Sequence, residues 1–340
     1  MDIATRKQKI LAAVIENYIA TGEPIGSKTL QSSEGFNISS ATIRNELADL
    51  TALGFLKQPH TSAGRVPTEA GYRFYVDNLM QVKEPDERVK RYVESRLRAA
   101  DDAPEHILEG CAELLSELLG IAAVATTPGG QDARVHRIRF VQTGRYTSML
   151  VLITSAGMVK SRLFRCDFAI TPEMLNVFDR ALNEQLAGVK LEFVNKAFAQ
   201  TFAASFGELG LLMPDMLMAA IEACRDALST SVYTAGGTRL LYQSDLITAR
   251  NVLEFLTDKR ESRKLFEMTP EETTVYIGKE NNSPLLRHSA LAVTKYNIDN
   301  LPAGTLGVIG PLRMNYPSAV SLLEYTAKTA GDMITELIAG

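Results

Sequence analysis

Apolar residues recur at helical spacing three times within the first eighty residues of the chain. Thr5 begins a capping-box sequence, and the apolar pattern after it predicts a helix to about residue 20. A short second helix is predicted from Gly26, and the third begins after Ser39, which is a favourable N-cap residue. The chain therefore starts with three helices separated by short polar connections.

The third helix has a predicted buried face and an outward face of distinct chemistry. Ile43, Leu47 and Leu50 recur at i, i+4 and i+7 and would face the first two helices. The other face suits the DNA major groove, because Arg pairs with guanine, Asn pairs with adenine, hydroxyls bind phosphate or bases, and small residues allow close approach. The candidate contacts on this predicted recognition helix are Ser39, Ser40, Ala41, Thr42, Arg44 and Asn45. An ordinary amphipathic helix with a solvated polar face would give the same pattern.

A β-hairpin is predicted directly after the third helix. Its strands lie at residues 55–58 and 65–67, and its tip consists of small and hydrogen-bonding residues. Three helices followed by a hairpin is the layout of a winged helix-turn-helix, in which the second helix and the wing contact the DNA backbone or minor groove. The candidate residues there are Ser27, Lys28, Lys57, His60, Thr61, Ser62 and Arg65. The alternative is a surface turn without a partner, but the order and spacing of the elements favour DNA binding.

Charge and composition change this picture in one respect. The chain has 340 residues with 36 Lys and Arg against 40 Asp and Glu, a net charge of −4 that by itself argues against nucleic acid. Residues 1–80, however, carry eight basic and eight acidic residues, so the net charge lies outside the predicted DNA-binding segment. No run approaches the roughly 18 apolar residues of a membrane span, so we expect a cytoplasmic protein with no membrane partner. Cys111, Cys166 and Cys224 are far apart, which favours neither a disulfide framework nor a zinc site.

The rest of the chain predicts an α+β body interrupted by an insertion. A highly charged segment at 83–103 predicts a linking helix, and Pro104 opens an apolar helix that ends near Gly120. An antiparallel meander is predicted at 137–142, 149–153 and 159–164, a mainly helical block at 171–228, strands at 275–277, 289–296 and 305–309, and a last helix from Pro317.

Several long motifs resemble those of the HrcA family, the bacterial heat-inducible transcription repressors. The motifs lie at residues 22–30, 39–46, 58–68, 71–77, 235–238, 277–281 and 307–316. The resemblance implies a homodimer that binds double-stranded DNA at CIRCE, an inverted-repeat operator of chaperone operons. It also implies that the GroEL chaperonin keeps the repressor active and that heat stress inactivates it.

The resemblance also implies a division into domains. It predicts a winged helix-turn-helix at 1–82, a linking helix at 83–103, a GAF-like α+β domain at 104–170 and 236–340, and an inserted, mainly helical dimerisation domain at 171–235.

Two other functions remain open at this point. A ligand-gated regulator would sense a small molecule through the GAF-like domain, although the sequence does not identify the ligand. A metabolic enzyme with an incidental helix-turn-helix is disfavoured, because the sequence has no HExxH, no GxxxxGK[ST] and no nucleophile-elbow context. We therefore expect no catalytic residue, no metal site and no cofactor.

Overall fold

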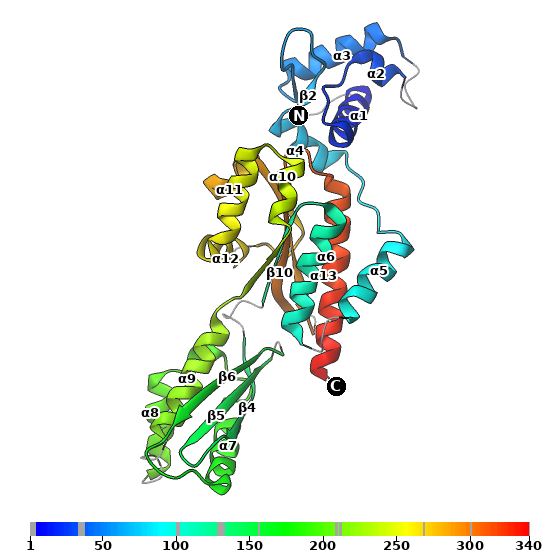
Figure 1. Cartoon of the computed structure of the whole chain (residues 1–340). Helices are drawn as coiled ribbons and strands as arrows, with labels where there is room; N and C mark the ends of the chain where they lie inside the picture. The colour runs from blue at the N-terminus through cyan, green and yellow to red at the C-terminus, as the bar shows by residue number, and fades with distance from the viewer. Residues whose placement is uncertain are drawn as a thin grey trace.

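The computed structural model describes residues 5–32, 38–99, 103–127, 133–155, 157–207, 210, 213–267, 269–299 and 301–339. The fold is α+β, with three units following one another along the molecule (Figure 1). We call residues 5–78 the N-terminal unit and residues 133–228 the inserted unit. The body is the remainder of the chain, built around a five-stranded sheet.

The N-terminal unit contains the predicted elements in the predicted order. They are α1 (Thr5–Thr21), α2 (Ser27–Gln31), α3 (Ser40–Ala52), β1 (Leu56–Lys57), β2 (Val66–Pro67) and α4 (Glu69–Asn78). Strands β1 and β2 pair antiparallel, and each is shorter than its apolar pattern suggested. The predicted inner face of α3 is confirmed, because Ile43, Leu47 and Leu50 are all buried.

The body has an antiparallel sheet in the order β7-β3-β10-β9-β8. Its strands are β3 (Ala122–Thr126), β7 (Val232–Ala235), β8 (Thr274–Ile277), β9 (Ser289–Ile298) and β10 (Leu301–Pro311). Its helices are α5 (Glu87–Arg98), α6 (Pro104–Leu119), α10 (Leu240–Gln243), α11 (Leu246–Thr257), α12 (Lys259–Glu267) and α13 (Tyr316–Ala339). Short 3-10 turns lie at η3 (Gly237–Arg239), η4 (Gly278–Glu280) and η5 (Pro284–Leu286). Helices α6 and α13 lie on one side of the sheet and α10–α12 on the other (Figure 1).

The body and the N-terminal unit share one hydrophobic core. A single cluster of buried residues runs from Ile10 in α1 through Tyr72 and Tyr75 in α4 to Ile334 in α13. The predicted linking helix is present as α5, and its buried Val93 faces the same cluster. The predicted boundary near residue 82 is therefore a change of element within one continuous core.

The inserted unit has a core of its own. It consists of β4 (Val135–Gln142), β5 (Thr147–Thr154), β6 (Val159–Arg165), α7 (Pro172–Leu186), η1 (Leu191–Phe193), α8 (Lys196–Ser205) and α9 (Pro214–Leu228). The three strands form the predicted antiparallel meander, and α7 and α9 pack on one face of it. A second cluster of buried residues joins these strands to these helices.

This arrangement corrects the predicted boundaries of the insertion. The prediction grouped the meander with the body and began the insertion at residue 171, which would separate strands β4–β6 from the helices that cover them. Thr127 and Ser231 instead hydrogen-bond to each other where the chain leaves β3 and returns as β7, with the Thr127 amide 3.0 Å from the Ser231 oxygen. The insertion therefore spans the segment between β3 and β7, and residues 232–235 belong to the body sheet.

Candidate nucleic-acid interface

The start of α3 is fixed by the cap that the sequence predicts. The Ser39 hydroxyl accepts a hydrogen bond from the Thr42 amide at 3.1 Å and lies 2.9 Å from the Thr42 hydroxyl. This interaction satisfies one of the amides that lack a partner in the first turn of a helix. Both hydroxyls are therefore already engaged in holding the helix end before any DNA arrives.

The outward face of α3 carries the side chains with the clearest base-reading chemistry. Ala41, Arg44 and Asn45 are exposed, on the side of the helix opposite the buried apolar residues. Among the residues that the structure describes, Arg44 and Asn45 make no hydrogen bond or ion pair with each other or with a neighbour. Their polar groups are therefore available to an external partner at no cost in internal contacts.

Helix α2 is held against α3 by a hydrogen bond between two of the predicted site residues. The Ser27 and Ser40 hydroxyls lie 2.9 Å apart, and both side chains are half-buried. Lys28, the next residue of α2, is exposed. The structure therefore gives Ser27 and Ser40 a structural role and leaves Lys28 as the exposed charge of α2.

Two acidic side chains on α3 pair with basic side chains of α1, an interaction that was not predicted from the sequence. Lys7 Nζ lies 2.9 Å from Asp49 Oδ2 and 3.2 Å from Glu46 Oε2, and Arg6 also approaches Glu46. These carboxylates, with the hydrogen bond to Asp49 first, raise the pKa of Lys7 above its ordinary value. The pairing reduces the repulsion that free carboxylates would exert on a phosphate backbone. Its residues lie on different helices, so spacing along the sequence does not reveal it.

The hairpin tip is exposed and internally ordered. His60, Thr61 and Ser62 are all exposed. The Gln58 side-chain amide donates to the Thr61 oxygen at 2.8 Å and to the Ala63 oxygen at 3.0 Å, which braces the turn from inside. The three predicted tip residues are therefore presented together on a fixed loop.

The surroundings of Arg65 and Lys57 were not predicted from the sequence. The backbone of Arg65 exchanges two hydrogen bonds with Ile25, and its Nε donates to the Thr51 hydroxyl at 3.0 Å, so it ties the hairpin to α3. Lys57 lines a cleft of about 460 Å³ together with Tyr72 of α4 and residues 243–245 and 247–248 of the body. The structure thus brings the hairpin-tip residues together and assigns Lys57 to the side that faces the body.

A second group of contacts joins the N-terminal unit to the body. Arg73 Nη1 donates to the Val275 oxygen at 2.9 Å and to Glu280 Oε2 at 3.2 Å, and the Lys279 amide donates to Glu69 Oε2 at 3.4 Å. Two motifs about two hundred residues apart therefore meet in space. Both motifs can be recognised in the sequence, but no local pattern encodes the contact between them.

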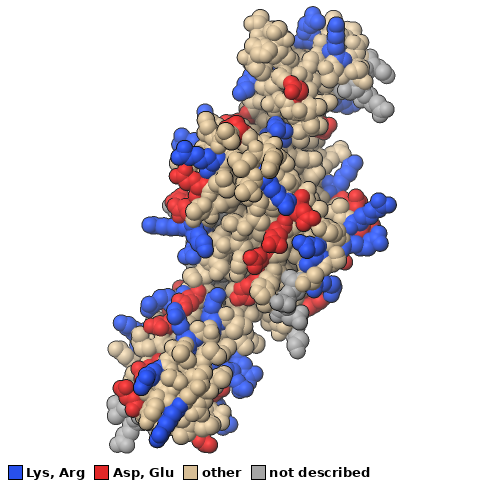
Figure 2. Space-filling view, viewed as in Figure 1, with Lys and Arg blue, Asp and Glu red and all other residues tan. Residues whose placement is uncertain are grey.

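Basic side chains are numerous at the end of the molecule where this interface lies. Figure 2 shows several Lys and Arg side chains projecting from the outer end of the N-terminal unit, with few acidic groups on the visible face of that unit. A face with more basic than acidic groups attracts a polyanion even though residues 1–80 as a whole are neutral. The distribution of charge is therefore more informative here than the net charge of −4.

The cysteine thiols lie in the cores of the body and the inserted unit. All three cysteines are buried free thiols, and burial raises the pKa of Cys166 to about 11 and that of Cys224 to about 12. Within the described ranges, no cluster of three or more His, Cys, Asp or Glu side chains has the arrangement of a metal site. No helix in the described part of the chain is both long and apolar enough to cross a membrane.

The family model and the similar proteins all indicate the same family. A family model described as the HrcA protein C terminal domain matches residues 105–320. A heat-inducible transcription repressor HrcA from Laribacter hongkongensis is 33% identical over 342 residues, covering 98% of this chain and 97% of its own. The protein with the same name from Moorella thermoacetica is 34% identical over 348 residues, covering 99% of both chains.

A solved structure shares the overall arrangement of elements. It is the crystal structure of a hypothetical protein at 2.2 Å resolution, with a TM-score of 0.67 and 24% sequence identity. The match covers 99% of this chain and all of the other. At this level of identity the likeness concerns the fold alone.

Proposed function

Because the chain belongs to the HrcA family of heat-inducible transcription repressors, we propose that it represses heat-shock chaperone operons by binding their operator DNA. The observation that carries the proposal is the outward face of α3, where Arg44 and Asn45 are exposed and unpaired among the described residues. Its target is an inverted-repeat operator of the CIRCE type. Occupied operator DNA excludes the transcription machinery, which makes the protein a negative regulator and not an enzyme.

The N-terminal unit acts in this proposal as a winged helix-turn-helix. Helix α3 enters the major groove, where Arg44 pairs with guanine, Asn45 pairs with adenine, and Ala41 allows the helix to approach closely. Lys28 and the tip residues of the hairpin contact the DNA backbone or minor groove. Ser27, Ser40 and Arg65 hold the module together, and the cap hydroxyls of Ser39 and Thr42 fix the end of α3.

The proposed dimer forms through the open face of the inserted sheet. Val141, Val159 and Leu163 on this face are 46%, 50% and 68% exposed, and Met149 lies between Val141 and Leu163 in the strand register. An exposed apolar patch of this kind, here beside Arg137 and Arg139 on the same face, is usually covered in the functional assembly. A second copy of the chain is the proposed partner, because two α3 helices related by a two-fold axis match two half-sites of an inverted repeat.

The proposed dimerising surface lies on strands that the expected division of domains placed outside the dimerisation domain at 171–235. Helices α7 and α9 cover the inner face of β4–β6, whereas the exposed apolar side chains belong to the strands. We assign the five-stranded sheet with helices on both sides to the GAF-like domain that the resemblance implies.

The chaperonin is the proposed partner in regulation. The repressor remains active while GroEL is available, and unfolded clients compete for GroEL during heat stress. Exposed Tyr242, Leu246 and Ile247 on α10 and α11 support this step, because exposed apolar side chains make a protein prone to association and suit an apolar-binding chaperone. Full operator binding that survives heating without chaperonin would contradict the regulatory mechanism.

A titration of operator DNA tests the repressor function directly. The full chain is mixed with a labelled inverted repeat and with a scrambled duplex of equal length and composition, at the same salt concentration. We expect clearly tighter binding of the inverted repeat. Equal affinity for the two duplexes would refute a sequence-specific repressor.

A pair of surface substitutions tests the dimer. Leu163→Glu places a charge on the proposed sheet interface, and Leu246→Glu places the same charge on the exposed part of α11 as a matched control. Sedimentation equilibrium should show that Leu163→Glu shifts the protein to monomers while Leu246→Glu does not. A dimer that persists in Leu163→Glu would place the interface elsewhere.

A ligand-gated regulator is the second candidate function. One observation favours it, namely a small cavity in the body beside the segment that holds the N-terminal unit. This function predicts a saturable effector that shifts operator affinity in the absence of chaperonin.

A further inference from the structure

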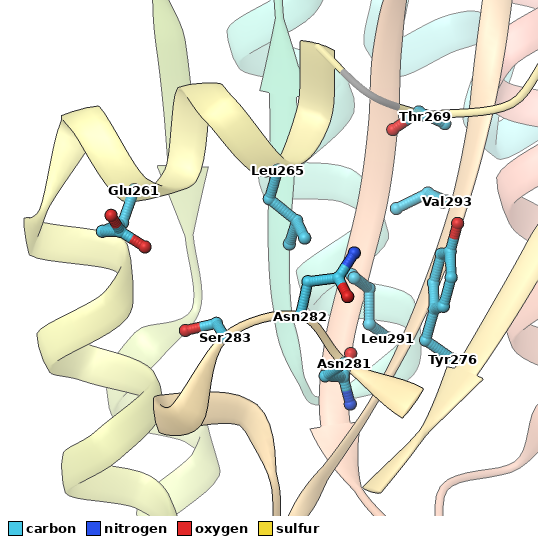
Figure 3. A pocket seen from close by; sticks show the side chains of 9 residues that line it. All are labelled: Glu261, Leu265, Thr269, Tyr276, Asn281, Asn282, Ser283, Leu291 and Val293. Atoms are coloured by element: carbon cyan, nitrogen blue, oxygen red, sulfur yellow. The ribbon is translucent and has the colours of Figure 1, made fainter. Parts of the chain in front are cut away.

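A small cavity of about 130 Å³ lies between α12 and the strands β8 and β9 (Figure 3). Leu265, Leu291 and Val293 supply an apolar side, and Tyr276 and Asn281 bring polar groups to it. Benzene fits an apolar cavity of about 150 Å³ in another protein, so this one suits a molecule of about six non-hydrogen atoms. The cavity is thus large enough for more than a single water molecule.

Asn281 presents an unused hydrogen-bond acceptor at this cavity. The residue is only 6% exposed, and its Nδ2 donates to the carbonyl oxygens of Gly278, Leu286 and Ser289 at 3.0–3.1 Å. Its Oδ1 is buried and has no hydrogen-bond partner among the described residues. In Figure 3 this oxygen lies on the cavity side of the amide and the nitrogen lies on the far side.

The orientation of this amide is determined by its neighbours. A flipped amide would direct its oxygen at three carbonyl oxygens and lose every donor contact, so the carbonyl end must face the cavity. A buried acceptor without a donor carries a free-energy penalty that a bound N–H or O–H group removes. The cavity therefore favours a ligand that donates a hydrogen bond.

The charge at the cavity selects among such donors. Glu261 is the acidic side chain among the described lining residues, and none of those residues is basic. Glu261 is exposed, so its carboxylate remains hydrated until a ligand approaches. The one charge of the described lining is therefore negative and favours a cation over an anion, while the basic residues of α12 lie outside this lining, and the alkyl part of a ligand can pack on the three apolar side chains.

We propose that this cavity is a binding site for a small aliphatic amine, bound as its ammonium ion. The ammonium N–H groups donate to Asn281 Oδ1, a short branched alkyl group occupies the apolar side, and the Glu261 carboxylate, on the other side of the lining, acts through its charge alone. Nothing else about the protein assigns a ligand to this place. Binding itself is independent of the repressor function.

The position of the site gives binding a route to the N-terminal unit, and this second step rests on the proposed repressor function. Asn281 ends the segment that begins at Val275, and this segment receives the Arg73 guanidinium at Val275 and Glu280. Asn281 also ties the carbonyl of Gly278 to η5 and to the first residue of β9. Filling the cavity therefore stabilises the surface on which α4 docks and changes the affinity for operator DNA.

Titration calorimetry on the full chain, without DNA, tests the site with three probes of one shape. The probes are isobutylamine, isobutyramide and isobutyrate, which carry positive, zero and negative charge at neutral pH. We expect saturable binding that is tightest for the amine and weakest for the carboxylate. Failure of the amine to bind, or binding of the carboxylate as tight as that of the amine, would overturn the proposal and leave the cavity to water.

Substitutions locate the binding and separate it from repression. Glu261→Gln should weaken binding of the amine by about two- to fivefold and leave the affinity for the amide unchanged, since an exposed charge pair contributes up to ~1 kcal/mol. Glu254→Gln, an exposed acid on neighbouring α11, is the matched control. Leu265→Phe should fill the cavity and abolish binding of both the amine and the amide. Amine affinity that is unchanged in both Glu261→Gln and Leu265→Phe would refute the site.

Operator titration with and without saturating isobutylamine tests the coupling. We expect the amine to change operator affinity in the unmodified chain and to have no effect in Leu265→Phe. Amine binding with no effect on operator affinity would refute the coupling step. A chain that binds the amine but no operator would refute the repressor function and leave the amine site intact.

Discussion

Replacing Arg44 with alanine separates the reading of DNA bases from the stability of the fold. The Arg44 side chain is exposed and unpaired among the described residues, so its removal should change the free energy of unfolding by less than about 0.5 kcal/mol. A bidentate contact with guanine discriminates against other bases by about 1–3 kcal/mol, which corresponds to roughly 5- to 150-fold per half-site. Because the inverted repeat has two half-sites, affinity for it should fall by up to the square of this factor, while affinity for a scrambled duplex changes little.

The assay compares operators in which each base pair of one half-site is changed in turn. Arg44→Ala should lose discrimination at one base position and keep it at the others. Lys28→Ala is the matched control, because loss of a phosphate contact should weaken all duplexes alike and reduce the salt dependence. A uniform loss for Arg44→Ala across every sequence would refute base reading and reassign the residue to the DNA backbone.

Ser39→Ala affects the same helix through its stability and not through a base contact. It removes the hydroxyl that caps α3 at the Thr42 amide and should cost about 1 kcal/mol in the free energy of unfolding, measured with urea. Unchanged stability would show that the cap is dispensable. The preference for particular bases should persist in the fraction of protein that remains folded.

Three further outcomes are expected. Gly71→Ala should lower the free energy of unfolding by about 1–3 kcal/mol, because the added Cβ would lie 2.2 Å from the backbone oxygen of Phe55; an unchanged urea midpoint would contradict this close approach. Stability should decline as pH rises from about 8.5 towards 11, because burial raises the pKa of Cys166 to about 11 and that of Cys224 to about 12, and the folded state holds these protons more tightly than the unfolded chain. Urea midpoints across that range measure the decline, and a flat profile would argue against buried thiols. Arg73→Ala should cost about 1–2 kcal/mol and speed hydrogen exchange in β8, which would remain unchanged if the N-terminal unit docked independently of this side chain.

The N-terminal unit shows how much of the fold follows from local sequence. The cap of α3 and its buried stripe of Ile43, Leu47 and Leu50 depend on residues within a few turns of each other, and both are present as predicted. The antiparallel meander at 135–165 was predictable for the same reason, because its strands are consecutive and joined by short turns. Interactions of short range are encoded where they occur.

Other elements had no local signal strong enough to predict them. Residues 122–126 form a short, wholly buried run of small residues, and such a run does not distinguish a strand from a helix. The strand at 232–235 and the helices between residues 240 and 267 were not predicted either. In the candidate interface, two features could not be predicted because they join residues that are distant in the sequence. They are the pairing of Lys7 with Asp49 and the position of Lys57 in the cleft that faces the body.

By itself, the sequence determined the types of most elements, the exposed chemistry of α3, the hairpin tip and the family. The tertiary structure alone decided which strands share a sheet, where the insertion begins and how the N-terminal unit docks on the body. The physical reason is the range of the interactions. Val124 pairs with Gly307 and Ala123 with Ala235 across more than one hundred residues, and such pairings are selected by burial of the whole sheet. Helix caps and apolar stripes need only their own neighbours.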